Sequence, residues 1–210
     1  MPQQLADSTR PDDGTGSLTA GDSTRPDDGA GSLTASPSTR PGSETGPVTA
    51  GPAKRASESA TEMVQVVLPN DANPLGFILG GTVMHLIDIA GAIACHRHTR
   101  SLLVTAAVDG LQFLHPIKVG DMIILKSRVT AAWSTSLEVQ VDVFSEETLT
   151  GLRRMTSRAY LTFVSIDRDG RRLSIPGLLL ETDEDKQGAA EADRRRAERL
   201  KARKELENRT

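Results

Sequence analysis

GTVMHLIDIAGAIACHRH, residues 81–98, decides the fold because its apolar side chains recur with the spacing of an α-helix. Residues three or four positions apart lie on the same face of a helix. The apolar face holds Val83, Leu86, Ile87, Ala90 and Ala94. We therefore predict one long helix whose apolar face packs into the core.

Strand-like runs lie on both sides of this helix in the sequence. Residues 62–67 read as a strand, and residues 69–76 are dense in turn formers. A long helix among long strands is an α+β pattern, and the simplest burial wraps an antiparallel sheet around the helix. Further strands are expected at residues 102–114, 122–134, 136–145 and 153–167.

The opposite face of the helix is small and nearly uncharged. It carries Met84, His85, Asp88, Gly91, Ala92 and Cys95. The chain's own sheet covers one side of the helix, and the outer face that remains lacks charge. This outer face is therefore expected to be buried against another element or another chain. A second copy of the chain is the economical cover, so we expect a homodimer.

The two ends of the chain differ from this central part. A fifteen-residue repeat containing Ser-Thr-Arg-Pro offers one Leu or Val per copy. These few apolar residues cannot offset the entropy that is lost when the chain becomes ordered. Residues 1–58 are therefore predicted to form a disordered tail of unassigned role. Residues 181–210 hold nine acidic and nine basic residues, which predicts an exposed charged helix. The domain between these ends spans residues 59–180.

Composition and charge weigh against several classes of protein. The 210 residues include 25 Lys and Arg against 28 Asp and Glu, so no overall positive charge favours nucleic acid or an anionic membrane. The single cysteine and the lack of Cys/His metal spacing predict a cytoplasmic protein with no metal and no other cofactor. We expect neither a secretory signal nor a membrane span.

Asp88 and the Gly80-Gly81 pair are placed where they could perform chemistry. Asp88 stands mid-helix among apolar neighbours, where an unpaired buried carboxylate is costly. It could accept hydrogen bonds or pair with an Arg across an interface, or it could be a base or nucleophile in a dry cleft. Gly80-Gly81, at the helix start, could serve close packing or expose N–H groups that polarise a carbonyl.

An ordered set of motifs resembles the hotdog-fold acyl-CoA thioesterases related to brain acyl-CoA hydrolase. The resemblance covers about residues 60–185. It begins with VLPNDAN at residues 67–73, Gly76, Gly80-Gly81 and residues 86–98, and it continues at residues 104–109, 116–121, 136–141 and 161–164. The sequence departs from the family at Leu79, where a His is frequent, and at Pro74.

This resemblance implies a hotdog fold, an obligate dimer, and hydrolysis of acyl-CoA thioesters to a fatty acid and free CoA, a reaction of fatty acid metabolism. It also implies that a loop Asn and a helix Asp act together, and these are Asn73 and Asp88 here. Related proteins often form trimers of dimers, which are homohexamers. The Ser-Leu-Glu-Val stretch nominates Thr135, Ser136 and Arg154 to bind CoA.

The distance between Gly81 and Asp88 along the helix indicates that two chains share the expected active site. Asp88 lies seven residues after Gly81, which places it roughly 10 Å along the helix. It cannot reach a carbonyl held by Gly80-Gly81 of its own chain, whereas an antiparallel partner helix could bring Asp88 of the partner subunit there. We expect that Asp88 activates water, while Asn73 orients the water or holds the carbonyl. Direct attack by Asp88 through an anhydride is the competing mechanism.

Two other functions are compatible with the same fold. A non-catalytic acyl-CoA sensor would lack the Asp or the Asn, and both are present. A hotdog dehydratase would use a His within a hydratase motif; His85 is available, but its neighbours do not follow that pattern. The preferred acyl chain and the assembly above the dimer are not determined by the sequence.

Overall fold

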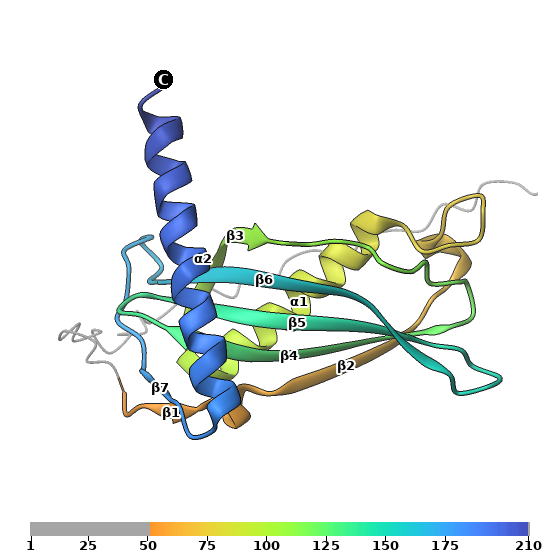
Figure 1. Ribbon diagram of the computed structural model, residues 1–210, viewed down its shortest axis with the longest axis horizontal. Helices are drawn as coiled ribbons and strands as arrows, with labels where there is room; N and C mark the ends of the chain where they lie inside the picture. Colours follow the sequence, from red (N-terminus) through yellow and green to blue (C-terminus); the bar gives the residue numbers. More distant parts are fainter. Residues whose placement is uncertain (1–50, 210) are drawn as a thin grey trace, which may run out of the picture. The chain divides into compact units, whose positions relative to one another are not determined.

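The computed structural model describes residues 51–209 and confirms the α+β class (Figure 1). The helix and all five strands expected of the central domain are present. Most of the predicted disordered tail, residues 1–50, lies outside the described residues. In chain order the elements are β1 (Lys54–Arg55), η1 (Ala56–Ser59), β2 (Thr61–Val66), η2 (Pro69–Asp71), α1 (Gly80–Thr99), β3 (Leu102–Asp109), β4 (Met122–Ala132), β5 (Ser136–Glu146), β6 (Arg153–Ile166), β7 (Leu178–Leu179) and α2 (Asp183–Glu207).

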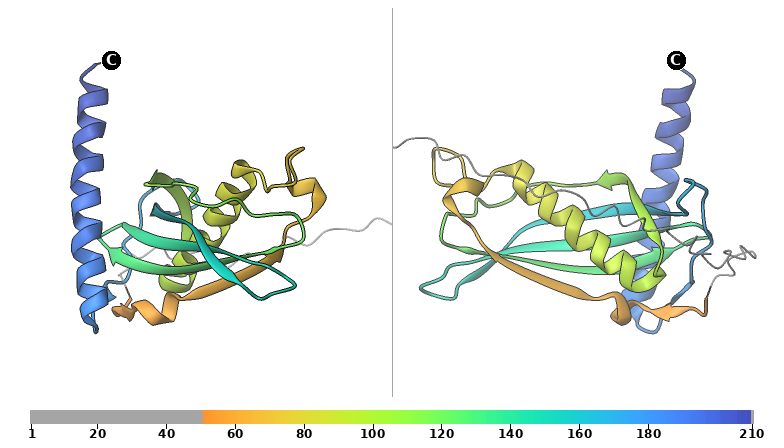
Figure 2. Two further views of the ribbon diagram at one scale, coloured as in Figure 1. Left: turned by 45° about the vertical axis from the view of Figure 1, so that its right-hand side comes forward. Right: turned by 180° about the vertical axis from the view of Figure 1, so that it is seen from behind.

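Five strands form one antiparallel sheet in the order β2-β4-β5-β6-β3. Strands β4, β5 and β6 follow one another as a meander, while β2 and β3 join its two sides. Helix α1 crosses one face of this sheet, where its main partners are β4 and β5 (Figure 2). This is the predicted sheet around a central helix, the hotdog arrangement.

More of the surface of α1 is buried than the spacing of its large apolar residues predicted. Gly91 and Cys95 were assigned to the outer face, but both are buried. The assignment was wrong because the sheet curves around α1 and covers more than one stripe of it. A Cβ at Gly91 would lie 3.1 Å from Val139 Cγ1 and 3.2 Å from the ring of Phe163. Glycine at this position lets the helix approach the sheet closely.

Gly91→Val is expected to lower the free energy of unfolding by about 1–3 kcal/mol, because the added methyl groups have no room between helix and sheet. The control is Gly188 of α2, where an added Cβ would meet nothing within 4 Å. Gly188→Ala should raise the same free energy by up to about 1 kcal/mol through helix propensity. Urea unfolding monitored by circular dichroism measures both, and equal effects of the two substitutions would contradict the packing argument.

Residues 51–58 are ordered, although the sequence analysis placed them in the tail. Strand β1 pairs in parallel with β7, more than a hundred residues later. Lys54 Nζ donates a 2.6 Å hydrogen bond to the carbonyl of His98, at the end of α1. The prediction was wrong at this boundary because the stabilising partners are distant in sequence and mostly polar.

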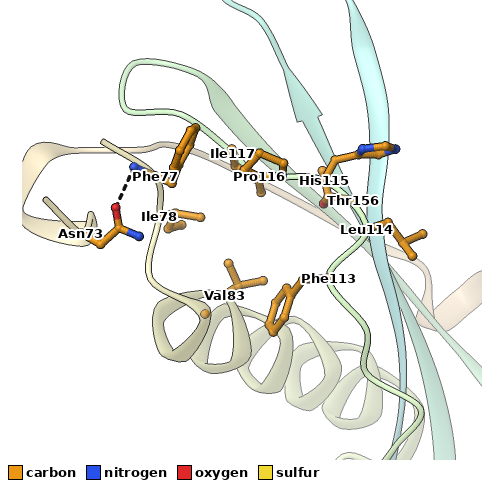
Figure 3. A pocket seen from close by; sticks show the side chains of 11 residues that line it. Asn73, Phe77, Ile78, Val83, Phe113, Leu114, His115, Pro116, Ile117 and Thr156 are labelled. Atoms are coloured by element: carbon orange, nitrogen blue, oxygen red, sulfur yellow. Dashed lines mark hydrogen bonds between the residues drawn. The ribbon is translucent and has the colours of Figure 1, made fainter. Parts of the chain in front are cut away.

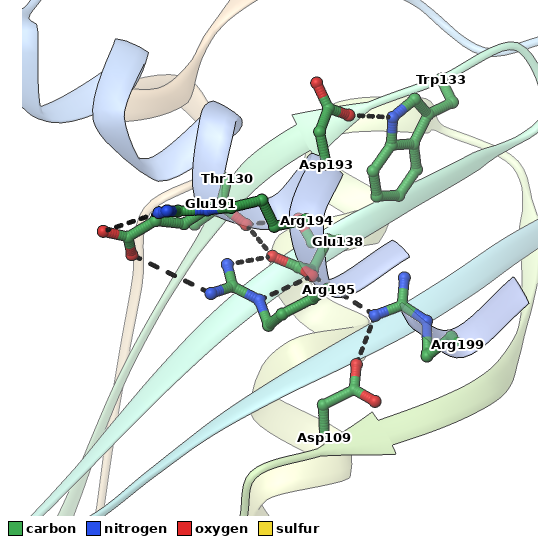
Figure 4. Close-up of polar contacts among 9 residues, drawn as sticks. All are labelled: Asp109, Thr130, Trp133, Glu138, Glu191, Asp193, Arg194, Arg195 and Arg199. Carbon is green, nitrogen blue, oxygen red and sulfur yellow. Dashed lines mark hydrogen bonds and ion pairs between the residues drawn. The ribbon is translucent and has the colours of Figure 1, made fainter. Parts of the chain in front are cut away.

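Helix α2 lies on the face of the sheet opposite α1 (Figure 2). The expected charged helix is present, but it is not simply exposed, because Ala192 is fully buried and Arg195 is largely covered. Arg195 donates two hydrogen bonds, of 2.8 and 3.2 Å, to the fully buried carboxylate of Glu138 on β5 (Figure 4). Its guanidinium also stacks 3.6 Å from the centre of the Tyr160 ring. These contacts attach α2 to the sheet with few apolar residues.

His98, near the end of α1, makes the stability of the fold sensitive to acid. The side chain is fully buried, and Nε2 lies 3.0 Å from the carbonyl of Pro176. Burial lowers the pKa of His98 below its ordinary value of 6.5, and the nearby Lys54 ammonium lowers it further. The unfolded chain therefore binds this proton more readily than the folded chain.

We expect the wild-type protein to lose stability as the pH falls below about 6.5, because protonation of His98 then favours the unfolded state. His98→Gln keeps an amide that can donate to the Pro176 carbonyl but does not titrate. Melting temperatures of the two proteins are measured from pH 8 to pH 5, about the range in which histidine titrates. Over this range the melting temperature of the wild type should fall more than that of the variant. Parallel curves for the two proteins would contradict the assignment.

Candidate active site

A cavity of about 320 Å³ opens beside the N-terminus of α1 (Figure 3). The loop before α1 forms one wall, and the segment between β3 and β4 forms the other. Most of the lining is apolar, as is usual for pockets that bind organic ligands. The lining residues are Asn73, Phe77, Ile78, Gly80, Val83, Phe113, Leu114, His115, Pro116, Ile117 and Thr156.

Asn73 is held by its own loop so that its amide nitrogen is available. Its Oδ1 accepts hydrogen bonds from the backbone N–H groups of Leu75, at 2.9 Å, and Phe77, at 3.3 Å. The Asn73 backbone N–H in turn donates to the Phe77 carbonyl. This turn uses the side-chain oxygen, so Nδ2 is the end of the amide that can serve a ligand.

Gly80 and Gly81 are the first two residues of α1. This is the position expected of residues whose backbone N–H groups bind a carbonyl. The first backbone N–H groups of a helix have no carbonyl partner within the helix, and the preceding Leu79 supplies no side-chain cap. The ring of Phe113 lies 3.5 Å from where a Cβ of Gly80 would be, whereas the space beside Gly81 is open to 4 Å. Of the predicted site residues, Asn73 and Gly80 line one cavity.

Asp88 lies away from this cavity within the same chain. It is on the second turn beyond Gly80, roughly 12 Å along the helix axis. Its Oδ1 accepts a 2.6 Å hydrogen bond from Thr105 Oγ1 of β3. Thr105 was not predicted, and it stands beside a register shift in the pairing of β3 with β6. The contact depends on β3 returning alongside α1, so only the resemblance of residues 104–109 could have indicated it.

The three residues nominated for CoA do not converge within one chain. Thr135 and Ser136 lie at the turn between β4 and β5, whereas Arg154 stands opposite Ser145 at the far end of β5. Nine residues separate Ser136 from Ser145, roughly 30 Å along an extended strand. Thr135 and Ser136 line a groove under α2, and Arg154 lines a separate small cavity with Lys118.

Other chemistries have little support among the described residues. Burial raises the pKa of the Cys95 thiol, and the Asp88 charge raises it further, which disfavours a thiolate nucleophile. Within residues 51–209, no three His, Cys, Asp or Glu side chains are grouped so as to hold a metal ion. None of the helices in this range is long and apolar enough to cross a membrane.

Comparison with known proteins identifies similar chains. Residues 75–152 match the thioesterase superfamily. An uncharacterised acyl-CoA thioester hydrolase of Bacillus subtilis is 37% identical over 128 residues, which are 61% of this chain and 74% of that protein. The human cytosolic acyl coenzyme A thioester hydrolase is 32% identical over 132 residues, 62% of this chain, and this match spans only 35% of its length.

Solved structures agree with these matches. An apo-hexameric acyl-CoA thioesterase superposes with a TM-score of 0.69 at 36% identity, over 72% of this chain and 97% of that one. An acyl-CoA hydrolase from Staphylococcus aureus, solved with butyryl coenzyme A and coenzyme A, gives a TM-score of 0.67 at 33% identity, over 75% of this chain and 98% of that one. Alanine variants of that hydrolase have been solved at one Asn, one Asp and one Thr.

Proposed function

This chain belongs to the hotdog-fold acyl-CoA thioesterase family, and from that membership we propose that Asn73 and Asp88 form its active site at the interface of a homodimer. Hydrolysis of acyl-CoA thioesters is the activity of the family. The observation that supports the proposed site is the cavity at the start of α1, which is lined both by Asn73 and by Gly80, the first residue of the helix. A carboxylate is missing from this cavity within one chain.

A second copy supplies that carboxylate. Strand β3 is the edge of the sheet, and it exposes Leu102, Val104 and Val108 to between 45 and 51%. An apolar edge of this kind is suited to pairing with the same edge of another copy. Such a pairing would run the two α1 helices antiparallel and bring Asp88 of the partner subunit towards the Asn73 cavity. Relatives solved as hexamers are compatible with further assembly of dimers.

The spacing of the altered residues in the Staphylococcus aureus hydrolase supports the same set. In that protein the Asn precedes the Asp by fifteen residues, and the Asp precedes the Thr by seventeen. Asn73, Asp88 and Thr105 have the same two intervals. We therefore include Thr105 in the site as the residue that orients the Asp88 carboxylate through its 2.6 Å hydrogen bond.

The proposed reaction uses these groups in sequence. The N–H groups of Gly80 and Gly81 and the amide of Asn73 donate to the thioester oxygen and stabilise the oxyanion. Asp88 accepts a proton from water, and the resulting hydroxide adds to the carbonyl carbon. Collapse breaks the C–S bond, and the CoA thiolate takes the proton from Asp88. In the competing route the Asp88 carboxylate attacks directly and water then hydrolyses the anhydride.

The dehydratase alternative has less support. The histidine that it would need, His85, is exposed and does not line the cavity at the start of α1. His115 does line that cavity, but no carboxylate of the same chain lines it with His115.

An assay of CoA release tests the proposed function. Purified protein is incubated with acyl-CoAs from acetyl to palmitoyl, and free CoA is detected with a thiol reagent. We expect turnover that Asp88→Asn abolishes while the variant keeps its dimer and melting temperature. The asparagine retains an oxygen that can accept the hydrogen bond from Thr105. Loss of activity would therefore be due to loss of the carboxylate and not to misfolding. An inactive wild-type protein that still binds acyl-CoA would favour the sensor alternative instead.

A further inference from the structure

Helix α2 crosses the outer face of the sheet and continues beyond the edge of that sheet (Figure 1). Its ion pairs contact the strands in spatial order. They join Glu184 to Arg128 of β4, Arg195 to Glu138 of β5, and Arg199 to Asp109 of β3. Among the described residues, β3 is the last strand on this side of the sheet. The helix therefore reaches the edge at Arg199, whereas it ends only at Glu207.

Residues 200–207 form an overhang that extends past the sheet of their own chain. Eight residues of helix are roughly 12 Å long. Neighbouring strands lie about 4.8 Å apart, so the overhang is long enough to cover two further strands. Every residue of the overhang is exposed, and Arg203 pairs with Glu207 of the overhang itself. A continuation of the sheet beyond β3 would lie beneath it.

Both large apolar residues of α2 lie in the overhang. Leu200 is 49% exposed and Leu206 is 67% exposed, whereas the preceding part of the helix is held to the sheet mainly through arginines. Both leucines line the groove between α2 and the sheet, on the side of the helix that carries the buried Ala192. Lys201 follows Ala192 by nine residues, which places it on the opposite side of the helix. The overhang therefore directs its leucines toward the level of the sheet.

Strand β3 in turn presents an apolar side chain on the outer face of the sheet. Residues that pair across neighbouring strands share a face. The pairing runs from Glu138, which lies under α2, through Thr162 of β6 to Ala107 of β3. Two residues further along β6, Val164 pairs with Val104 of β3, so Val104 lies on this outer face as well. Val104 is 45% exposed, so α2 of the same chain leaves much of it uncovered.

We infer that the overhang of α2 packs on the outer face of the partner subunit's sheet, with Leu200 and Leu206 against its edge strand. In the proposed homodimer, β3 of one copy pairs with β3 of the other, so the sheet continues past its edge with the same outer face. The first strand of the partner subunit then lies beneath the overhang. The two-fold axis makes the contact reciprocal, since each copy contributes one overhang and receives another. This inference rests on the proposed dimer, but not on the chemistry of its active site.

A photoreactive side chain tests this contact in the full chain. Leu206 is replaced by benzoylphenylalanine, and the variant is refolded together with an equal amount of isotopically labelled wild-type protein. Illumination should join position 206 of one chain to residues 102–109 or 160–166 of the other, and mass spectrometry of the labelled peptides identifies links between chains. The matched control carries benzoylphenylalanine in place of Lys201, on the opposite side of α2, and should give less than about a tenth of the inter-chain product.

The strength of the dimer provides an independent measurement. Leu200→Gln combined with Leu206→Gln should raise the dissociation constant of the dimer about thirtyfold in sedimentation experiments, because the apolar contact between overhang and sheet is lost. Lys201→Gln is the matched control and should leave the constant unchanged. Glutamine and leucine have similar helix propensities, so circular dichroism should show the same helix content in all three proteins.

These outcomes separate the overhang contact from the proposed function. If dimers form but position 206 links only within its own chain, or if the leucine variant dimerises as tightly as the wild type, the contact is overturned while the shared active site stands. A wild-type protein that remains monomeric at every concentration would overturn both. Inter-chain links at position 206 together with a weakened leucine variant would support the contact even if no acyl-CoA is hydrolysed.

Discussion

Mixing Asn73→Asp and Asp88→Asn proteins is expected to restore about a quarter of wild-type thioester hydrolysis, although each variant alone should lose at least about a hundredfold. Asn73→Asp keeps the oxygen that accepts from Leu75 and Phe77 but removes the amide donor. Asp88→Asn keeps an acceptor for Thr105 but removes the base. Both changes are nearly isosteric, so the fold and the dimer should survive them.

The expected fraction follows from which chain supplies each residue. Random pairing after unfolding and refolding makes half of the dimers mixed. If Asn73 of one subunit works with Asp88 of the partner subunit, each mixed dimer holds one doubly altered site and one intact site. If both residues acted within one chain, every site would carry one change and no activity would return. Mass spectrometry must confirm the mixed dimers, and a mixture that then stays inactive would contradict the shared site.

Glu138→Ala is expected to lower the free energy of unfolding by about 3 kcal/mol, because it removes the partner of a largely buried guanidinium. Glu138 is fully buried, and Arg195 is 19% exposed. The alanine leaves Arg195 without its two hydrogen bonds and deprives Thr130 of an acceptor. Urea denaturation curves that report the sheet and α2 together would measure the loss.

A double substitution shows how much of that loss is an uncompensated charge. Replacing Glu138 and Arg195 together by leucine should recover most of the stability, since two apolar side chains need no partners. Arg194→Ala is the surface control, and its exposed pair with Glu191 should contribute less than about 1 kcal/mol. A double variant as unstable as Glu138→Ala would show that Glu138 contributes through packing and not through its charge.

The helix and the five long strands could be predicted because each has a local period in the sequence. The helical spacing of Val83, Leu86 and Ile87 places these residues in the core, where all three are buried. The width of the buried surface could not be read in the same way. It depends on the curvature of a sheet whose last strand ends seventy-five residues after Gly91 (166 − 91), so Gly91 and Cys95 were placed on the wrong face.

The candidate site could be predicted only where its parts are close in sequence. Asn73 and Gly80 are separated by one loop, and they line one cavity. Thr105 contacts Asp88 through a strand pairing that the spacing of residues does not contain. The position of α2 was missed for a related reason, because its contact with Glu138 joins residues fifty-seven positions apart and is ionic. Hydrophobic periodicity is not informative about contacts of that kind.

The connectivity of the sheet has a consequence for the order of folding. Strands β4, β5 and β6 pair with their neighbours in sequence. In contrast, β2 must close a loop that contains α1 to reach β4, and β3 must close a loop that contains β4 and β5 to reach β6. Short loops close at lower entropic cost, so the three-stranded meander is expected to form first and to act as the nucleus. Asn73, Asp88 and Thr105 all lie on segments that dock afterwards, so the catalytic groups are assembled at the end of the pathway. Substitutions at these positions should therefore accelerate unfolding more than they slow folding.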